Sequence, residues 1–395
     1  MQHDLRRPVA QLFAHGAKLT ALRPGAPKPC GTTAATGKGM KRVILTTGGT
    51  GGHVFPALAV AETLRNNGVE CLFVGSQYGR EGEWAREAGL EFVGLPVRGV
   101  LGRGFRSVGA LLGMVRAVGM ARTLLKDWKP EAVAGFGSYA SCASLVAART
   151  LGIPILVHEQ NSYPGLTNRL MGKLAKTVCL SMDDASESGF EAGKCVWTGN
   201  PVRKSILAAA DRMHPDGTHA PHLLVLGGSL GAKAVNSVVL AGLPRLMEAG
   251  ITIRHQTGRD DYERVEAGYK AHGLDSSGVT PFIDGMAEAY AWADLVLCRA
   301  GASTVAELAV CGKAAVFIPF PYATHDHQAH NARIVCREGA GMMFSEQEAV
   351  QKDVTGTLLM LLRDKDQLLM MGKAALTLAR PDAAESVTAE IMKLA

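Results

Sequence analysis

A glycine-rich segment that ends in a histidine, Gly48–His53 (GGTGGH), follows the apolar run Val43–Leu45. Glycines after a strand let backbone N–H groups approach an anion at the start of the next helix. The dinucleotide fingerprint does not fit, because Val54 takes the place of its third glycine and the next strand ends in Val74–Ser76 without an acid. No Gly-Lys-Ser/Thr follows, which excludes a P-loop. The segment predicts an anion site of another kind.

His53 lies beside this turn, at the carboxyl edge of the expected sheet, where ligands bind in folds of this type. A neutral imidazole there can take a proton from an attacking hydroxyl. A histidine that merely caps the helix is the alternative that its position leaves open.

A second glycine turn, Gly227–Gly231 (GGSLG), follows the apolar run Leu223–Leu226. The Ser229 hydroxyl and the small residues around it, at a helix start, suit the diphosphate of a nucleotide sugar. Arg203, in the segment Gly199–Arg203 (GNPVR), is a candidate bidentate partner for that diphosphate. An ordinary surface arginine in a linker is the alternative.

A third such turn opens the segment Arg299–Glu307 (RAGASTVAE), after the apolar strand Leu295–Cys298. Glu307 is expected about one turn inside a helix, where its carboxylate can accept hydrogen bonds from two ribose hydroxyls. As an isolated glutamate it could equally belong to a solvated helix face.

A histidine-rich segment invites a metal interpretation through His325, His327 and His330. We do not favour a metal, because Asp326 fits a helix N-cap and the histidines have no clear carboxylate partner. Gln328 is the better candidate, for a sugar hydroxyl. The one Asp-x-Asp triplet, Asp364–Asp366, follows a helical Leu/Met run and is expected to face solvent. The leaving group's charge is then met by helix N-termini and Arg203, with no cofactor and no ion required.

The elements that must position these groups alternate between short β-branched runs and helical stretches, which predicts parallel sheets with crossover helices. The expected strands are Val43–Thr46, Cys71–Val74, Ala132–Ala134, Ile155–His158, Leu223–Leu226, Ile251–His255, Val279–Phe282, Leu295–Cys298 and Ala315–Ile318. A strand, a glycine turn and a helix open each half of the chain; the helices are expected at Pro56–Arg65 and from about Lys233. This repeat predicts an α/β protein with two Rossmann-like domains. We expect a disordered extension over residues 1–39, domains over 40–200 and 201–375, and a C-terminal helix within 376–395 that can pack back on the first domain.

Composition excludes other classes. Of the 42 Lys and Arg, eight lie in residues 1–42 beside one acid, so the remaining chain carries 34 basic and 35 acidic residues. This near-neutral body gives no case for nucleic-acid binding. The eight cysteines are scattered without a C-x-x-C, which predicts reduced, mostly buried thiols of a cytosolic protein. The longest apolar runs, Leu111–Leu125 and Ala140–Val157, are interrupted by arginines and are expected to be buried elements rather than membrane spans.

Taken together, the motifs closely resemble the MurG family of bacterial N-acetylglucosaminyltransferases from about Lys41 to the C-terminus. The ordered set is Gly48–Pro56 (GGTGGHVFP), His158–Asn161 (HEQN), Gly199–Arg203, Gly227–Ala232, Phe282–Met286 (FIDGM) and Arg299–Glu307. The resemblance implies a GT-B fold and metal-free, inverting transfer from UDP-N-acetylglucosamine to the muramyl 4-hydroxyl of undecaprenyl-pyrophosphoryl-muramyl-pentapeptide. It also implies that the C-terminal domain supplies most donor contacts and that His53 is the base.

The residues that match the family's donor contacts are Thr50, Gly51, Gly52, Asn161, Arg203, Ser229, Ile283, Ala302, Ser303, Thr304, Val305, Ala306, Glu307 and Gln328. One departure concerns the acceptor side: where the family usually has Gly-Tyr-x-Ser-Gly-Pro, this chain has Ser138–Ala143 (SYASCA). Three other functions on related folds stay open: a glycosyltransferase acting on diacylglycerol, a UDP-N-acetylglucosamine epimerase, and a catalytically silent UDP-sugar sensor.

A basic and apolar stretch between Phe92 and Lys126 carries no acid. Its basic residues are Arg98, Arg103, Arg106, Arg116, Arg122 and Lys126, interleaved with Val100, Leu101, Phe105, Leu111, Leu112 and Met114. Such a surface suits anionic headgroups, which predicts peripheral attachment to the cytoplasmic face of the bacterial membrane. An ordinary amphipathic helix with solvated arginines is the alternative.

Overall fold

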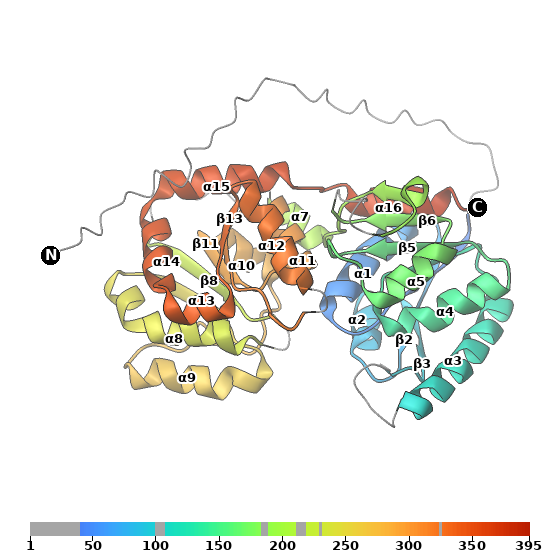
Figure 1. Ribbon diagram of the computed structural model, residues 1–395, viewed down its shortest axis with the longest axis horizontal. Helices are drawn as coiled ribbons and strands as arrows, with labels where there is room; N and C mark the ends of the chain where they lie inside the picture. The colour runs from blue at the N-terminus through green and yellow to red at the C-terminus, as the bar shows by residue number, and fades with distance from the viewer. Residues whose placement is uncertain (1–39, 99–106, 183–188, 211–218, 229–230, 324–325) are drawn as a thin grey trace, which may run out of the picture. The chain divides into compact units, whose positions relative to one another are not determined.

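The computed structural model describes residues 40–395, apart from 99–106, 183–188, 211–218, 229–230 and 324–325 (Figure 1). The expectations for the extension 1–39, for Ser229 and for His325 therefore lie outside the described residues, as do those for Val100, Leu101, Arg103, Phe105 and Arg106.

The first lobe is built on a seven-stranded, all-parallel sheet in the order β3-β2-β1-β4-β5-β6-β7. The strands are β1 (Arg42–Thr46), β2 (Glu70–Ser76), β3 (Glu91–Leu95), β4 (Ala132–Gly135), β5 (Ile155–Glu159), β6 (Thr177–Leu180) and β7 (Cys195–Trp197). Its helices are α1 (Gly51–Asn66), α2 (Glu81–Glu87), α3 (Ser107–Trp128), α4 (Ser138–Thr150), α5 (Leu166–Leu174) and, from the far end of the chain, α16 (Ala383–Met392).

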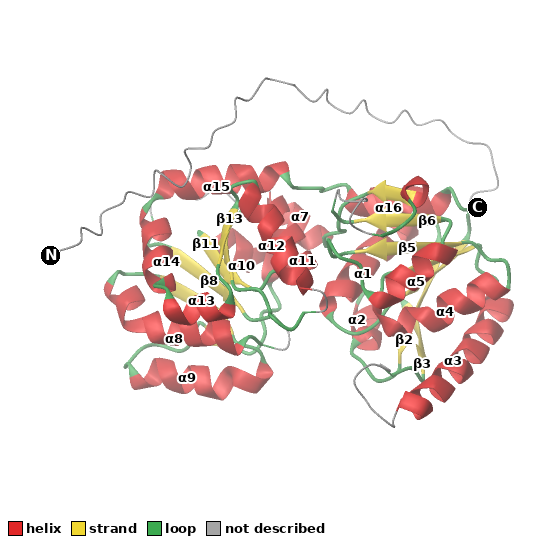
Figure 2. Cartoon of the chain, in the orientation of Figure 1, coloured by secondary structure: helices red, strands yellow, loops and turns green. Residues whose placement is uncertain are grey.

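The second lobe is built on a six-stranded parallel sheet in the order β10-β9-β8-β11-β12-β13 (Figure 2). The strands are β8 (His222–Leu226), β9 (Thr252–Gln256), β10 (Val279–Thr280), β11 (Leu295–Cys298), β12 (Ala314–Phe317) and β13 (Gly341–Met343). Its helices are α7 (Lys204–Ala210), α8 (Lys233–Glu248), α9 (Tyr262–Ala271), α10 (Met286–Trp292), α11 (Ala302–Val310), α12 (His327–Arg337), α13 (Glu346–Gln351), α14 (Val354–Arg363) and α15 (Lys365–Thr377).

Each sheet is buried on both faces, which explains why its central strands are continuous apolar runs. In β1, Val43 and Leu45 pack into one hydrophobic core, while Ile44 packs into the core on the opposite face. β8 divides in the same way, with Leu224 on one face and Val225 on the other. The helices that connect the parallel strands cover both faces and complete these cores.

The last helix returns to the first lobe. α16 packs against α1 and β6, and its residues Val387 and Ile391 are fully buried in the core that also holds Val43 and Leu45. The chain therefore crosses between the lobes twice, once after Trp197 and again before α16.

All nine expected strands exist, with ends that match or differ by one or two residues. β10 stops at Thr280, so Phe282 is not in a strand. The larger difference is at α1, which begins at Gly51 rather than at Pro56. The Thr50 carbonyl accepts hydrogen bonds from the backbone N–H groups of His53 and Val54, so the glycines form the first turn of the helix.

The described cysteines are free thiols, as the scattered spacing predicted. Four are buried, namely Cys71, Cys179, Cys298 and Cys311, and three are partly buried, namely Cys142, Cys195 and Cys336. Burial raises the pKa of the Cys71 and Cys311 thiols to about 12, which keeps them protonated and unreactive at neutral pH.

Candidate active site

Both sheets reverse their strand order beside the strand that carries a glycine turn. The switch lies between β1 and β4 in the first sheet and between β8 and β11 in the second. Ligands of open α/β sheets bind in the crevice outside the carboxyl ends of the strands at such a point. The topology therefore brings the segments after β1, β8 and β11 to the positions where a nucleotide is bound.

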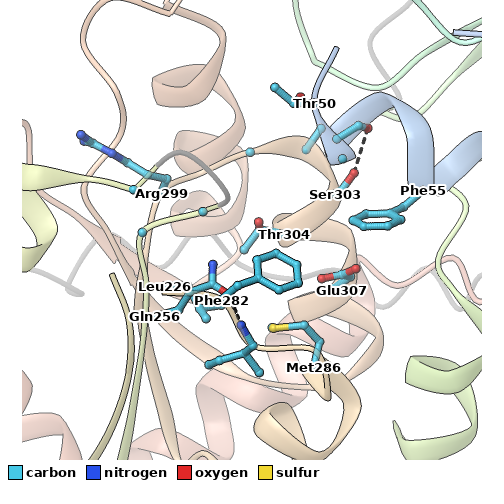
Figure 3. Close-up of a pocket in the computed structure, with 18 of the residues that line it drawn as sticks. Thr50, Phe55, Leu226, Gln256, Phe282, Met286, Arg299, Ser303, Thr304 and Glu307 are labelled. Atoms are coloured by element: carbon cyan, nitrogen blue, oxygen red, sulfur yellow. Dashed lines mark hydrogen bonds between the residues drawn. The ribbon is translucent and has the colours of Figure 1, made fainter. Parts of the chain in front are cut away.

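A cavity of about 370 Å³ lies at these strand ends (Figure 3). This volume is in the range of small-molecule sites. From the first lobe it is lined by Thr50, Gly51, Gly52, Phe55 and Trp84, and from the linker by Arg203. From the second lobe it is lined by Leu226, Gly227, Gly228, Gly231, Gln256, Phe282, Ile283, Met286, Tyr290, Arg299, Gly301, Ala302, Ser303, Thr304, Glu307, Phe320 and Gln328.

Helix N-termini supply much of the cavity's polar surface. Thr50 and Gly301 are the N-caps of α1 and α11, both in extended conformation, and neither makes a side-chain capping bond. The first N–H groups of a helix have no partner inside it and carry the positive end of the helix dipole. The cavity is therefore suited to a negatively charged ligand.

Arg203 and Glu307 form the charged pair of the cavity wall. The arginine Nη2 lies 3.1 Å from the Glu307 Oε1, and the Tyr290 hydroxyl donates to Oε2 at 3.0 Å. Burial raises the pKa of the Glu307 carboxyl, while Arg203 and Tyr290 act in the opposite direction. The arginine also stacks over the Phe55 ring at 4.5 Å, and its buried Nε has no hydrogen-bond partner among the described residues.

An apolar compartment lies beside this pair. Phe282, Ile283 and Met286 line it, and Figure 3 shows the Phe282 and Met286 side chains on the same side as Glu307. The Gln256 Oε1 accepts a hydrogen bond from the Ile283 N–H at 2.9 Å, which fixes the backbone of this segment. A flat ring with polar edges fits such a compartment.

The Arg299 guanidinium, at the edge of the cavity formed by the Ile318–Phe320 loop, makes its hydrogen bonds within the protein. Its Nη1 donates to the Ile318 and Pro319 carbonyls, and its Nη2 pairs with Glu346 at 2.5 Å. The same loop is held by Gln328, whose Oε1 accepts from the Phe320 N–H at 3.0 Å. Gln328 keeps its amide NH₂ group as a donor.

His53 directly follows Gly52 on the first turn of α1, but it is not among the residues that line the cavity. Its Nδ1 lies 2.7 Å from the Gln160 Oε1. Burial lowers the pKa of the imidazole, and the hydrogen bonds to Gln160 and the Phe136 carbonyl oppose this shift. The ring is therefore neutral at physiological pH, as a base must be.

Ten of the residues predicted to bind the substrate line the cavity: Thr50, Gly51, Gly52, Arg203, Ile283, Ala302, Ser303, Thr304, Glu307 and Gln328. Three do not. Val305 and Ala306 face a separate cavity of about 250 Å³, because successive residues of α11 point to different sides of the helix. Asn161 lies outside both lining sets; its side chain and backbone N–H bond to the Glu159 Oε1.

Several lining residues were not among the predicted site residues. Trp84, Gln256, Tyr290 and Phe320 come from segments without glycine turns, whereas Phe55 belongs to the first glycine motif, Gly48–Pro56. Phe55 and Trp84 lie against each other at 5.3 Å between ring centroids, although 29 positions separate them in the chain. No local pattern marks Trp84, because it reaches the site through the packing of α2 on α1.

The expected N-cap of α12 is at Asp326, but the cap works differently from the prediction. Asp326 has a φ of +54°, in the left-handed region, and makes no side-chain capping bond. Its carboxylate lies 3.4 Å from the Arg333 guanidinium instead. In the Asp-x-Asp triplet Asp364–Asp366, the exposed Asp364 caps α15 by accepting a hydrogen bond from the Gln367 N–H.

Within the described part of the chain, one group of side chains has ligand atoms close enough for a metal ion: His219, His222 and Asp294. The two imidazoles stack at 4.3 Å with 6° between their planes. A ligated metal lies in the plane of each imidazole, and two parallel, separated planes share no such point. In this arrangement the group is a stacked pair, and we assign no metal to it.

Comparison with known proteins agrees with this geometry. The glycosyltransferase family 28 N-terminal domain matches residues 43–180, and the family 28 C-terminal domain matches residues 222–387. A relative from Nitratidesulfovibrio vulgaris is 51% identical over 90% of this chain and 98% of its own length. One from Lawsonia intracellularis is 50% identical over 89% and 97%. Both are named UDP-N-acetylglucosamine–N-acetylmuramyl-(pentapeptide) pyrophosphoryl-undecaprenol N-acetylglucosamine transferase.

The crystal structure of Acinetobacter baumannii MurG has a TM-score of 0.72 and 36% identity, over 89% of this chain and 99% of that one. The chain belongs to the MurG family. Membership in the MurG family makes it a glycosyltransferase, and the predicted GT-B fold with two parallel-sheet lobes is confirmed. A UDP-N-acetylglucosamine 2-epimerase from Neisseria meningitidis has a TM-score of 0.63 at 12% identity, which is a likeness of fold alone.

Helix α3 carries part of the basic and apolar stretch between Phe92 and Lys126. No helix within the described ranges has the length and apolar character needed to cross a bilayer. On α3, Leu112 and Val115 are about two-thirds exposed and the adjacent Arg116 is exposed, while Lys126 is exposed about three turns further along the helix. Arg122 is held by the Thr150 hydroxyl at the neighbouring helix α4.

Proposed function

We propose that this member of the MurG family transfers N-acetylglucosamine from UDP-N-acetylglucosamine to the muramyl 4-hydroxyl of undecaprenyl-pyrophosphoryl-muramyl-pentapeptide. One observation carries the proposal: the helix N-termini after β1 and β11 and the Arg203–Glu307 pair line one cavity, in a chain 51% identical to a transferase of that name.

The donor occupies this cavity. Glu307, buried and fixed by Tyr290, accepts hydrogen bonds from the ribose hydroxyls, and the Ile283 segment holds the uracil. The Gly227 N–H donates to the Gln256 carbonyl and the Gly231 N–H to the Gly228 carbonyl, so the Gly228 N–H and Arg203 bind the diphosphate. The place of Arg203 on the cavity wall, beside the Glu307 carboxylate, supports this role.

The reaction inverts the anomeric carbon. The 4-hydroxyl oxygen forms a bond to that carbon from the face opposite UDP, while the bond to the diphosphate oxygen breaks and its electrons leave with UDP. His53 takes the hydroxyl proton. Arg203 and the helix N-termini stabilise the developing charge on the diphosphate, so the step needs no metal ion.

The acceptor is lipid-linked, and we propose that the enzyme meets it at the cytoplasmic face of the membrane. The exposed Leu112 and Val115 with the neighbouring Arg116, and Lys126 further along the same helix, support peripheral attachment. Apolar side chains enter the headgroup region while basic ones pair with anionic lipids.

Release of UDP from UDP-N-acetylglucosamine tests the proposal. We expect release with the muramyl lipid, and none with diacylglycerol or without an acceptor. Release that needs diacylglycerol would identify the lipid glycosyltransferase, conversion of the donor without acceptor an epimerase, and donor binding without release a sensor. Any of these three results would overturn the proposal.

A further inference from the structure

A buried chain of hydrogen bonds runs from His53 into the first lobe through two residues of the His158–Asn161 motif. The His53 Nδ1 lies 2.7 Å from the Gln160 Oε1, and the Gln160 Nε2 lies 3.1 Å from the His158 Nδ1. The His158 Nε2 lies 3.0 Å from the Gly199 carbonyl oxygen. Gln160 and His158 are 1% and 0% exposed, so water does not compete for these contacts.

The orientation of the Gln160 amide is fixed by the backbone. Its Nε2 donates to the Phe136 carbonyl at 3.0 Å, a group that can only accept. The reverse orientation would place two acceptor oxygens against each other. The Oε1 must therefore face His53, and because a carbonyl oxygen cannot donate, the hydrogen between them lies on the His53 Nδ1.

The other end of the chain agrees with this assignment. The Gly199 carbonyl also can only accept, so the His158 Nε2 carries the hydrogen there and the His158 Nδ1 keeps a lone pair. That lone pair accepts the second N–H of Gln160. One arrangement of hydrogens fits these contacts with both histidines neutral, the second N–H of Gln160 lying between the His158 Nδ1 at 3.1 Å and the His158 carbonyl oxygen at 3.3 Å.

We propose that Gln160 is a positioning residue that holds His53 as the Nδ1–H tautomer and so keeps the lone pair on its Nε2, the atom that takes the acceptor's proton. This inference rests on the proposed function, in which His53 is the base. The tautomer of a histidine is set by the hydrogen bond that its other nitrogen makes. Without Gln160, the imidazole can place its hydrogen on Nε2, where it cannot accept a proton.

Nuclear magnetic resonance of ¹⁵N-histidine-labelled protein tests the tautomer without reference to activity. Spectra are recorded at about pH 8, above the ordinary pKa of histidine, and the His53 signals are assigned by their loss in His53→Ala. We expect a protonated Nδ1 and an unprotonated Nε2 in the wild type, and a mixture of tautomers in Gln160→Met. A wild-type His53 with its hydrogen on Nε2 would overturn the proposal.

Turnover and donor affinity then separate positioning from a purely structural role. Gln160→Met should lower kcat by about tenfold or more and leave the Kd for UDP within about twofold, since general-base assistance contributes on the order of 10²–10⁴-fold. Gln351→Met, at an exposed position of α13, is the control and should change neither. A folded Gln160→Met protein with wild-type kcat would contradict the proposal.

Gln160→Glu is the conservative variant and keeps an acceptor for the His53 Nδ1–H. It should restore only part of the turnover lost in Gln160→Met, because its second oxygen faces the Phe136 carbonyl and the His158 Nδ1, to which Gln160 donates. The acid limb of its pH profile should move to higher pH, because a carboxylate stabilises the imidazolium, whereas Gln160→Met should move it to lower pH. The same loss and no shift in both variants would indicate a structural role and overturn positioning.

The two proposals fail in different ways. Wild-type turnover in His53→Ala would remove the base from the proposed function, whatever the tautomer is. A large loss in His53→Ala, combined with an Nδ1–H tautomer that persists in Gln160→Met, would retain the base and remove Gln160 from its role.

Discussion

The hydroxyl of Ser303, in the first turn of α11, donates a hydrogen bond to the carbonyl of Gly52, in the first turn of α1, across 3.0 Å. Inside a helix the Gly52 carbonyl would accept the N–H of the residue four positions later. That residue is Pro56, which has no N–H. Pro56, at which the helix was expected to start, therefore leaves the Gly52 carbonyl without a partner inside α1. Ser303 of the second lobe donates to that carbonyl.

This relationship predicts coupling between Ser303 and Pro56. Ser303→Ala should lower the free energy of unfolding by about 1 kcal/mol, the usual net value of one hydrogen bond. In a Pro56→Ala background the carbonyl regains a helical partner, so the same change should cost less. A double-mutant cycle by chemical denaturation measures the difference. Strict additivity would show that the carbonyl does not depend on Ser303.

The Arg203–Glu307 pair predicts a loss of donor affinity when its charge is removed. Glu307→Gln keeps the size of the side chain but ends the ion pair and one ribose acceptor. We expect the Kd for UDP to rise by about tenfold or more, equivalent to about 1.4 kcal/mol, with a smaller change in kcat. Isothermal titration measures it. Glu338→Gln, exposed at the end of α12, is the matched control; equal affinities for the two variants would count against the ribose role.

Two buried histidines predict loss of stability in mild acid. Burial lowers the pKa of His158 to about 4 and that of His255 to about 3, and both are 0% exposed. Below about pH 6.5 the unfolded chain binds protons that the folded chain does not, so stability falls as the pH falls. Between about pH 7.5 and 5 each should contribute a loss of about 2 kcal/mol.

Denaturation curves at several pH values check this pH dependence. His255→Gln is the informative variant, since His255 contacts Asn236 and Tyr269 and lies away from the Gln160 chain. It should be less stable at neutral pH yet show a shallower loss toward pH 5. A slope unchanged from the wild type would show that His255 is not held neutral in the fold.

Ser138 predicts a stabilising substitution. It begins α4 with a φ of +66°, in the left-handed region, directly after Gly137 at +86°. The left-handed conformation costs an L-residue roughly 1–2 kcal/mol, and glycine avoids most of it. Ser138→Gly should therefore raise the free energy of unfolding by about 1 kcal/mol. Ser138→Ala retains the Cβ and should bring no gain; a gain of equal size would trace the effect to the hydroxyl.

The sequence predicted the parts of the fold that depend on local pattern. The central strands, such as β1 and β11, are continuous apolar runs, and Leu295–Cys298 was placed to the residue. β3, β7 and β13 were missed because they lie at the sheet edges and are largely half-buried, so they resemble loops. β6 was missed as well, although it lies inside the sheet and three of its four residues are buried. The start of α1 was missed because Gly51 and Gly52 favour turns in isolation, and only the fold makes them helical.

The candidate site shows the same division. The glycine turns, Arg203 and Glu307 were recognisable because backbone access and charge leave a mark on the sequence. The expectation that Glu307 would be an open acceptor did not include its bonds to Arg203 and Tyr290, which join residues 104 and 17 positions apart. Hydrogen-bond partners so far apart in the sequence depend on how the helices and strands pack. That packing cannot be read from a single sequence.

The return of α16 to the first lobe determines how the protein can be divided. Val387 and Ile391 fill a core begun by Val43 near the opposite end of the chain. A fragment that ends after β7 would expose this apolar surface and should aggregate, whereas adding the α16 segment as a separate peptide should restore its solubility. The first lobe is thus made from two stretches of chain. During translation it can complete its core only after the whole second lobe and α16 have been synthesised.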